Sequence, residues 1–166
     1  MRARDAMSAH IKHVEMTLAT RLGSINRAEK VSLRVAAEAG FDDDDCHKIS
    51  MAVREGVINA FQYGNRQCKE KKIHLVFDVT PEKLIVHVRD EGNGFKLASL
   101  PNPLAEENLL KTSGRGIFLM RALMDELDVK QGTRGGAEIV LSKTLPGARA
   151  SREPRNGNRT RYVKGR

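Results

Sequence analysis

Two polar side chains stand four residues apart in a stretch with helical apolar periodicity. Glu55 and Asn59 occupy positions i and i+4, so both project from one face of a helix. An Asn carboxamide offers a neutral oxygen to a hard cation such as Mg²⁺, which takes phosphates and water as its other ligands. A Glu one turn away can orient or deprotonate a nucleophile that attacks a γ-phosphate. In isolation, the same pair is also typical of the solvated face of an amphipathic helix.

A second segment places an acid at the end of an alternating apolar run. Asp90 ends this run, and Gly92 and Gly94 follow it. A carboxylate fixed there can accept a hydrogen bond from an exocyclic amine such as that of adenine, and the glycines leave space for a planar ligand. The alternative is an ordinary turn, because Asp, Gly and Asn are all common turn residues.

The third segment is a short glycine element. Gly114 and Gly116 flank Arg115 directly before an apolar helical run. Backbone N–H groups at a helix N-terminus can face phosphates, and Arg115 would add positive charge. A single Gly-x-Gly is weak evidence, since it equally describes a plain helix start.

Taken in this order and spacing, the three segments resemble the N, G1 and G2 boxes of the GHKL (Bergerat-fold) ATPases. That superfamily includes gyrase B, MutL and the catalytic domains of histidine kinases. Within it, residues 52–65 and 114–125 look like those of the stand-alone anti-sigma-factor serine/threonine kinases. Two departures, Gly56 in place of a common Ala and Tyr63 in place of a common His, remove no catalytic group.

The resemblance implies a role for each matching residue. Glu55 would be the general base, Asn59 the Mg²⁺ ligand and Asp90 the acid that binds adenine. The remaining matches are the glycines of the nucleotide loops, with Arg115 between two of them: Gly92, Gly94, Gly114 and Gly116.

The implied function is a regulatory kinase that uses ATP and Mg²⁺. Such a kinase phosphorylates a Ser or Thr of an anti-sigma-factor antagonist (a STAS-type protein) and sequesters a sigma factor; the resemblance also implies a homodimer. The residues alone predict only Mg·ATP binding and phosphoryl transfer. The alternative is a non-catalytic, nucleotide-gated protein-binding module of the same fold. Glu55 favours the kinase, because a binding module needs no base.

Periodicity predicts the elements that must position these residues. A change from helical to alternating spacing indicates an α+β fold: a two-layer α/β sandwich with a mixed, mostly antiparallel sheet and helices on one face. Ser24 is the expected cap of the first helix. Residues 95–113 form a long connection, typical of a lid or binding loop, with a short helix expected near 106–110. The predicted strands are 11–22, 73–79, 84–90, 126–130 and 137–145, and the predicted helices are 24–40, 46–64 and 117–123.

The composition is that of one globular domain. The chain has 166 residues, of which 40% are hydrophobic, enough for a single core. No apolar run approaches the roughly 18 residues of a membrane span, and the first residues lack a signal-peptide core, so a cytoplasmic location is expected. Two cysteines do not suggest a disulfide framework. Neither His10 and His13 nor the acids of 42–45 need be metal ligands; the acids are more simply a helix cap and dipole charges.

The net charge of +8 is concentrated at one end. After Pro146 there are seven basic residues and one acid, so the rest of the chain is close to neutral. We therefore expect a flexible N-terminus (1–10), an ATP-binding kinase domain (11–145) and a disordered basic tail (146–166). The tail could bind nucleic acid or an acidic protein, or only increase solubility. The near-neutral domain argues against a protein whose main function is nucleic-acid binding.

Overall fold

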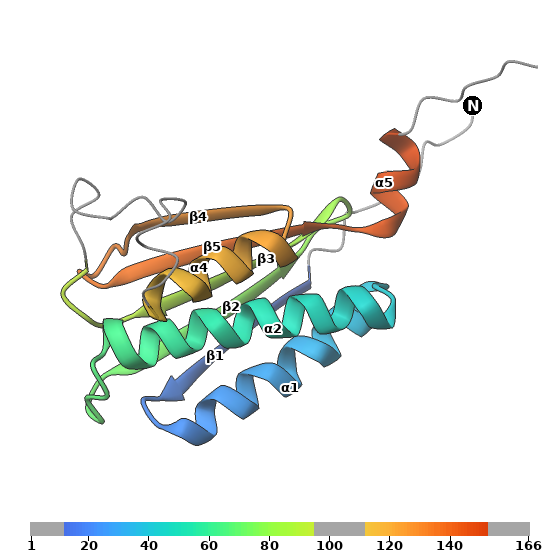
Figure 1. The fold of residues 1–166 in the computed structure, drawn as a ribbon. Coiled ribbons are helices and arrows are strands. Elements are labelled where there is room, and N and C mark those ends of the chain that lie inside the picture. Colours follow the sequence, from blue (N-terminus) through green and yellow to red (C-terminus); the bar gives the residue numbers. More distant parts are fainter. Residues whose placement is uncertain (1–11, 95–111, 153–166) are drawn as a thin grey trace, which may run out of the picture.

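The computed structural model describes residues 12–94 and 112–152 (Figure 1). A helical layer covers one face of a five-stranded sheet, and a short π-type turn, η1, extends the central helix. The elements in chain order are β1 (Lys12–Ala19), α1 (Leu22–Ala39), α2 (Asp43–Asn59), η1 (Ala60–Gly64), β2 (Lys72–Val79), β3 (Lys83–Asp90), α4 (Thr112–Leu123), β4 (Glu126–Gln131), β5 (Ala137–Thr144) and α5 (Pro146–Arg152).

The sheet has the order β1-β2-β3-β5-β4, and each neighbouring pair is antiparallel. Helices α1, α2 and α4 lie on one face of it, with α2 in the middle (Figure 1). The predicted α+β two-layer sandwich is therefore confirmed, although the described sheet is wholly antiparallel rather than mixed. Alternate strand residues fill the core between the layers, as the period of two requires: Leu18, Ile73, Leu75, Phe77, Leu84, Val86, Val88, Ile139 and Leu141.

Helix α2 is the element that carries the predicted base Glu55 and the predicted Mg²⁺ ligand Asn59. Asp42 caps it, because its carboxylate accepts a hydrogen bond from the Asp45 N–H at 2.8 Å. Ile49, Val53 and Val57 are fully buried against the sheet and fix the rotation of the helix. With that face buried, Glu55 and Asn59 are left half-buried on its flank.

Some predicted boundaries are wrong. The first strand ends at Ala19, and α1 already begins at Leu22. Ser24 therefore lies inside the helix, and its buried hydroxyl donates to the Ala19 carbonyl at 2.6 Å instead of capping the helix. Helix α4 begins at Thr112, not at Ile117, so the glycines expected before the helix lie within it. The predicted connection keeps only residues 95–111, which lie outside the described residues together with the expected helix at 106–110.

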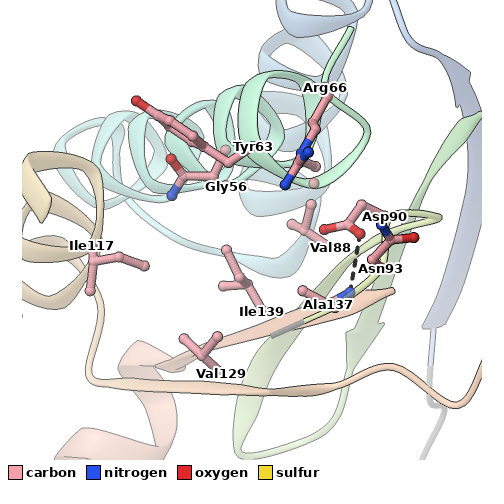
Figure 2. Close-up of a pocket in the computed structure, with 14 residues that line it drawn as sticks. Gly56, Tyr63, Arg66, Val88, Asp90, Asn93, Ile117, Val129, Ala137 and Ile139 are labelled. Atoms are coloured by element: carbon pink, nitrogen blue, oxygen red, sulfur yellow. Dashed lines mark hydrogen bonds between the residues drawn. The ribbon is translucent and has the colours of Figure 1, made fainter. Parts of the chain in front are cut away.

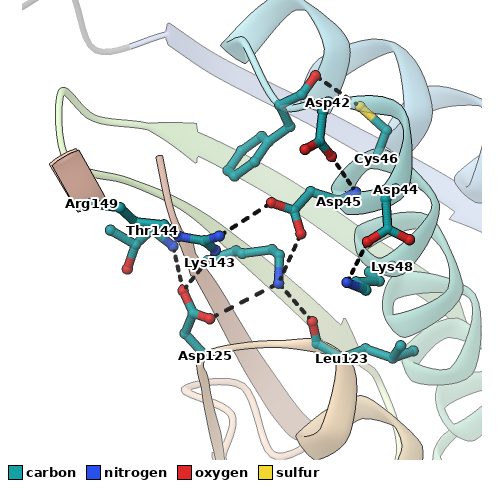
Figure 3. Close-up of polar contacts among 11 residues, drawn as sticks. Asp42, Asp44, Asp45, Cys46, Lys48, Leu123, Asp125, Lys143, Thr144 and Arg149 are labelled. Atoms are coloured by element: carbon teal, nitrogen blue, oxygen red, sulfur yellow. Dashed lines mark hydrogen bonds and ion pairs between the residues drawn. The ribbon is translucent and has the colours of Figure 1, made fainter. Parts of the chain in front are cut away.

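The predicted disordered tail is wrong for its first residues, because Pro146–Arg152 form α5. Arg149 explains the contact of this helix with the domain: its guanidinium lies 3.4 Å from Asp45 Oδ2 and 3.5 Å from Asp125 Oδ2 (Figure 3). The buried Lys143 bridges the same two acids and donates to the Leu123 carbonyl at 2.9 Å. Residues 1–10 and 153–166 lie outside the described residues.

We expect the basic tail to contribute little to stability. Deleting residues 153–166 should leave the melting temperature unchanged. Deleting 147–166 also removes Arg149, whose side chain is 44% exposed, so the loss should stay below about 1 kcal/mol because Lys143 still neutralises Asp45. Thermal unfolding of the two deletions, with Arg149→Ala in the full chain as control, measures this. A much larger loss for 147–166 alone would make α5 part of the core.

Several side chains of the alternative metal sites pair with other groups, and His10 lies outside the described residues. Asp44 pairs with Lys48, Asp45 pairs with Lys143, and His13 pairs with Asp78. Across 12–94 and 112–152, no cluster of three or more His, Cys, Asp or Glu side chains is arranged to hold a metal ion. The same residues contain no helix that combines the length and apolarity to cross a membrane.

Candidate nucleotide-binding site

A cavity of about 310 Å³ opens between the end of α2, the start of α4 and the sheet (Figure 2). This volume is at the lower end of the range typical of small-molecule pockets. Three predicted site residues, Asn59, Asp90 and Gly94, line it. The other lining residues are Gly56, Ala60, Tyr63, Gly64, Arg66, Val88, Asn93, Ile117, Val129, Ala137 and Ile139.

Asp90 is held at the end of β3 by two backbone hydrogen bonds. Its Oδ1 accepts from the Gly92 N–H at 2.9 Å and from the Ala137 N–H at 3.1 Å. Its other carboxylate oxygen turns toward the cavity (Figure 2). Burial raises the pKa of Asp90, although both backbone hydrogen bonds act in the opposite direction. The arrangement leaves one oriented acceptor facing the cavity, as recognition of an amine requires.

Three glycines allow the backbone to close around this carboxylate. A Cβ at Gly64 would overlap the Asp90 carboxylate, and one at Gly92 would overlap the Gly64 carbonyl. A Cβ at Gly136 would overlap the Asp90 carbonyl. Gly92 was predicted, whereas Gly64 and Gly136 were not predicted as site residues. Their role depends on contacts between η1, β3 and β5, which no local pattern reveals.

Glu55 and Asn59 meet the third segment across the helix layer. A Cβ built on Gly116 of α4 would lie 3.2 Å from Glu55 Oε2 and 3.4 Å from both the Oδ1 and the Nδ2 atom of Asn59. Glycine at 116 thus lets the carboxylate and the carboxamide lie directly against the first turns of α4. The acid and amide predicted from spacing are together, and Asn59 also borders the cavity.

The remaining predicted residues lie around this centre in different ways. Gly94 lines the cavity with a φ of +70°, and a Cβ there would overlap the Gln131 amide. Gly114 stands in the first turn of α4, where backbone N–H groups have no partner within the helix. Arg115 is exposed and is not among the residues that line the cavity. Its predicted contact with phosphates stays a prediction.

The floor of the cavity is apolar. Val88 and Ile139 from the sheet and Ile117 from α4 face it (Figure 2). Gly56 permits the close approach of α2 to this floor, since a Cβ there would lie only 3.2 Å from Val88 Cγ2. A flat apolar floor with one oriented carboxylate at its edge suits a purine base whose amine faces that carboxylate.

Comparison with known proteins identifies the family of this domain. A family model described as "Histidine kinase-like ATPase domain" matches residues 18–143, which is most of the chain. The protein belongs to the histidine kinase-like ATPase family. The match covers every strand and helix that forms the site, from the end of β1 to β5.

The chain is also similar to curated serine-protein kinases. It is 26% identical over 149 residues to serine-protein kinase RsbW of Bacillus velezensis, covering 86% of this chain and 92% of that one. It is 29% identical over 125 residues to serine-protein kinase RsbW of Bacillus subtilis, covering 72% and 77%. The predicted membership of the histidine kinase-like (GHKL) ATPases is therefore confirmed, and the chain is similar to serine-protein kinases of this group.

A solved structure supports the fold of this ATPase domain. The RsbU and RsbW domains of Rv1364c from Mycobacterium tuberculosis match with a TM-score of 0.58 and 20% identity. The match covers 81% of this chain but only 32% of that longer chain. At this identity, the likeness supports the architecture alone.

Asn65, next to the candidate site, was also not among the predicted site residues. Its side chain is buried and joins three segments: it donates to Thr20 Oγ1 at 2.8 Å and to the Lys72 carbonyl at 2.9 Å, and accepts from the Glu91 N–H at 2.8 Å. Glu91 directly follows Asp90, so Asn65 fixes the chain where the acid leaves the strand. Its position directly after a predicted helix end was the only signal available in the sequence.

We expect Asn65→Ala to weaken ATP binding about fivefold to tenfold as well as lowering stability. The variant leaves the Glu91 N–H without its acceptor, which costs roughly 1–3 kcal/mol if no water replaces it and frees the loop beside Asp90. Thr20→Val is the matched control, because it removes the other side of the network and leaves the Glu91 hydrogen bond intact. Calorimetric titration and thermal unfolding of both variants separate the effects. Equal affinity losses in both variants would contradict a specific role for Asn65 at the site.

Proposed function

We propose that this protein is an ATP-dependent regulatory serine/threonine kinase that phosphorylates an anti-sigma-factor antagonist and sequesters a sigma factor. The observation that carries the proposal is the meeting of Glu55, Asn59 and Gly116 beside a cavity that ends at Asp90. A general base, a cation ligand and a base-recognising acid are the minimum set for transferring a phosphoryl group from a bound nucleotide.

The donor set fits Mg·ATP. The Asp90 oxygen that faces the cavity would accept the adenine amine, and the apolar floor would contact the ring. Asn59 would offer its carboxamide oxygen to Mg²⁺, which neutralises phosphate charge when bound. The first turn of α4 includes Gly114, and the N–H groups that a helix start leaves unpaired would donate to phosphate oxygens there.

Glu55 supports catalysis rather than binding alone. Its carboxylate would accept the proton of the attacking Ser or Thr hydroxyl while the oxygen–phosphorus bond forms and the bond to the ADP leaving group breaks. It lies beside Asn59, so the accepting oxygen would be close to the metal that Asn59 would hold. A protein substrate is the proposed acceptor because the curated relatives are serine-protein kinases.

The second candidate is a nucleotide-gated binding module without catalysis. One observation favours it: Glu55 is not among the cavity-lining residues, so a nucleotide could bind without contacting it. The partner switch and the homodimer are parts of the proposal that come from the family resemblance, and the cytoplasmic location comes from the sequence.

The deciding experiment starts from proteins that this chain captures from its host's extract, with and without Mg·ATP. The captured proteins are then incubated with the purified kinase and γ-³²P-ATP. The kinase is supported if a Ser or Thr of one captured protein becomes labelled and that labelled protein is released from the kinase. ATP binding with no label on any partner supports the binding module. No adenine-nucleotide binding at all would overturn both.

A further inference from the structure

The turn after η1 has an uncommon backbone. Arg66 and Gln67 adopt φ values of +49° and +58°, and they are the two non-glycine residues with positive φ in 12–94 and 112–152. Residues other than Gly rarely adopt a positive φ, and residues that do are common at functional sites.

Hydrogen bonds on both sides hold this turn in place. The Gln67 N–H donates to the Phe61 carbonyl at 2.8 Å, and the Cys68 N–H donates to the Asn65 carbonyl at 3.0 Å. The buried Asn65 side chain anchors the preceding residue to β1, β2 and the end of β3. The direction in which Arg66 leaves the backbone is therefore fixed by its surroundings.

Only one of the two residues faces the site. Arg66 lines the cavity and extends from the end of η1 toward Val88 and Asp90 (Figure 2). Among the cavity-lining residues that the structure describes, Arg66 alone carries a positive charge. Within 12–94 and 112–152, no carboxylate forms an ion pair with it, and Asp90 is held by backbone groups instead.

We propose that Arg66 is an adenine-contacting residue whose guanidinium plane lies on the face of the base held by Asp90. The inference rests on the proposed nucleotide binding. Asp90 would contact the edge of the base, and Val88 and Ile139 would contact one of its faces. The opposite face is therefore the one that Arg66 can reach. A planar guanidinium stacks on a nucleobase through dispersion and cation–π attraction, and every adenine nucleotide offers that face.

A base contact is favoured over a phosphate contact by position. In the cavity, Arg66 stands with Gly64 and Asp90, where the amine of the base would be read. The phosphate end of the cavity is marked by Asn59 and Gly116. Asn59 stands seven residues before Arg66 in the chain, and Gly116 lies on α4. An arginine serving the phosphates would be expected at that end.

The test is calorimetric titration of adenosine, ADP and Mg·ATP into Arg66→Ala, Arg66→Lys and Gln67→Ala. Gln67 is the matched control because it is exposed, adjacent and at positive φ but does not line the cavity. Arg66→Ala should weaken all three ligands by about the same factor, roughly tenfold. Arg66→Lys should restore only part of the loss for all three ligands, since Lys keeps the charge and some cation–π attraction but has no planar face to stack. Gln67→Ala should bind as the wild type does.

Each other outcome identifies a different error. If the losses are confined to ADP and Mg·ATP and are repaired by Lys, the contact is with phosphate and the inference is overturned. Equal losses in Gln67→Ala would assign the effect to the turn and not to the guanidinium. Unchanged binding in Arg66→Ala also overturns the inference while leaving the proposed function intact. If wild-type protein binds none of the three ligands, the proposed function fails first.

Discussion

Glu55→Ala is expected to transfer phosphate at least about a hundredfold more slowly than the wild type at saturating ATP. Removing a positioned general base costs roughly 10²–10⁴ in rate. Mg·ATP affinity should change little, because Glu55 contributes no atom to the cavity lining. The combination of a lost rate and a retained affinity is what distinguishes a catalytic base from a structural carboxylate.

Asn59→Ala should differ in kind from Glu55→Ala. Asn59 borders the cavity and would hold Mg²⁺, so its loss should reduce metal-dependent nucleotide affinity together with the rate of transfer. Titration with ATP in Mg²⁺ and in EDTA measures the metal-dependent part. In Asn59→Ala, the difference between the two conditions should largely disappear.

The comparison needs the true protein substrate and a neighbouring control. Arg54 precedes Glu55 and pairs with Glu29 of α1 at 2.8 Å, so Arg54→Ala tests general damage to α2. Its transfer rate should stay close to that of the wild type. If Glu55→Ala phosphorylates the substrate at the wild-type rate, the general-base assignment is wrong. If the wild type transfers phosphate to no captured partner, the nucleotide-gated binding module is the better account.

Local periodicity was sufficient to predict the frame of the site. The helical spacing around Val53 and Val57 fixed which face of α2 is buried, and therefore where Glu55 and Asn59 lie. The alternating spacing of β3 placed Asp90 at a strand end. These predictions succeeded because each depends on burial within one element, which the sequence records directly.

The parts that were missed depend on contacts between elements. Around Asp90 lie Gly64 of η1, Gly136 of the turn before β5 and Asn65 of the connection to β2. Their importance follows from backbone approaches and long-range hydrogen bonds. The start of α4 was misplaced because glycine has low helix propensity, whereas the close packing of Gly116 on α2 requires it within the helix. Tertiary contact outweighed local preference at each of these positions.

Asp90→Asn should weaken ATP binding by about a hundredfold while the fold is retained. The Asn carboxamide oxygen can still accept from the Gly92 and Ala137 N–H groups, so its NH₂ group must occupy the place of the oxygen that faces the cavity. An acceptor thereby becomes a donor opposite the adenine amine. Losing a charge-assisted hydrogen bond costs roughly 1.5–3 kcal/mol, and the unpaired donor adds to that loss.

The apo variant should be at least as stable as the wild type at neutral pH. Burial raises the pKa of Asp90 above its ordinary value, so the ionised carboxylate is a cost to the folded state. When the pKa of an acid is higher in the folded than in the unfolded protein, its protonated form stabilises the folded state. This contribution to the free energy of unfolding is complete below the pKa of the unfolded state and is lost as the pH rises through the pKa of the folded state. Above the folded pKa the ionised carboxylate carries this cost, and the neutral Asn avoids it. Thermal unfolding of the wild type and of Asp90→Asn, from acidic to neutral pH, measures the sign of the difference in stability.

Exchanging the nucleotide tests the recognition step itself. GTP presents a carbonyl oxygen where ATP presents an amine, so the wild type should prefer ATP, and Asp90→Asn should narrow or invert that preference. Glu91→Gln is the control, since Glu91 is exposed and bonds His74 and the Lys72 N–H rather than the cavity. A folded Asp90→Asn variant with wild-type ATP affinity and an unchanged ATP preference would exclude Asp90 from the site. A shift toward GTP in this variant alone would identify the Asp90 carboxylate as the group that selects adenine.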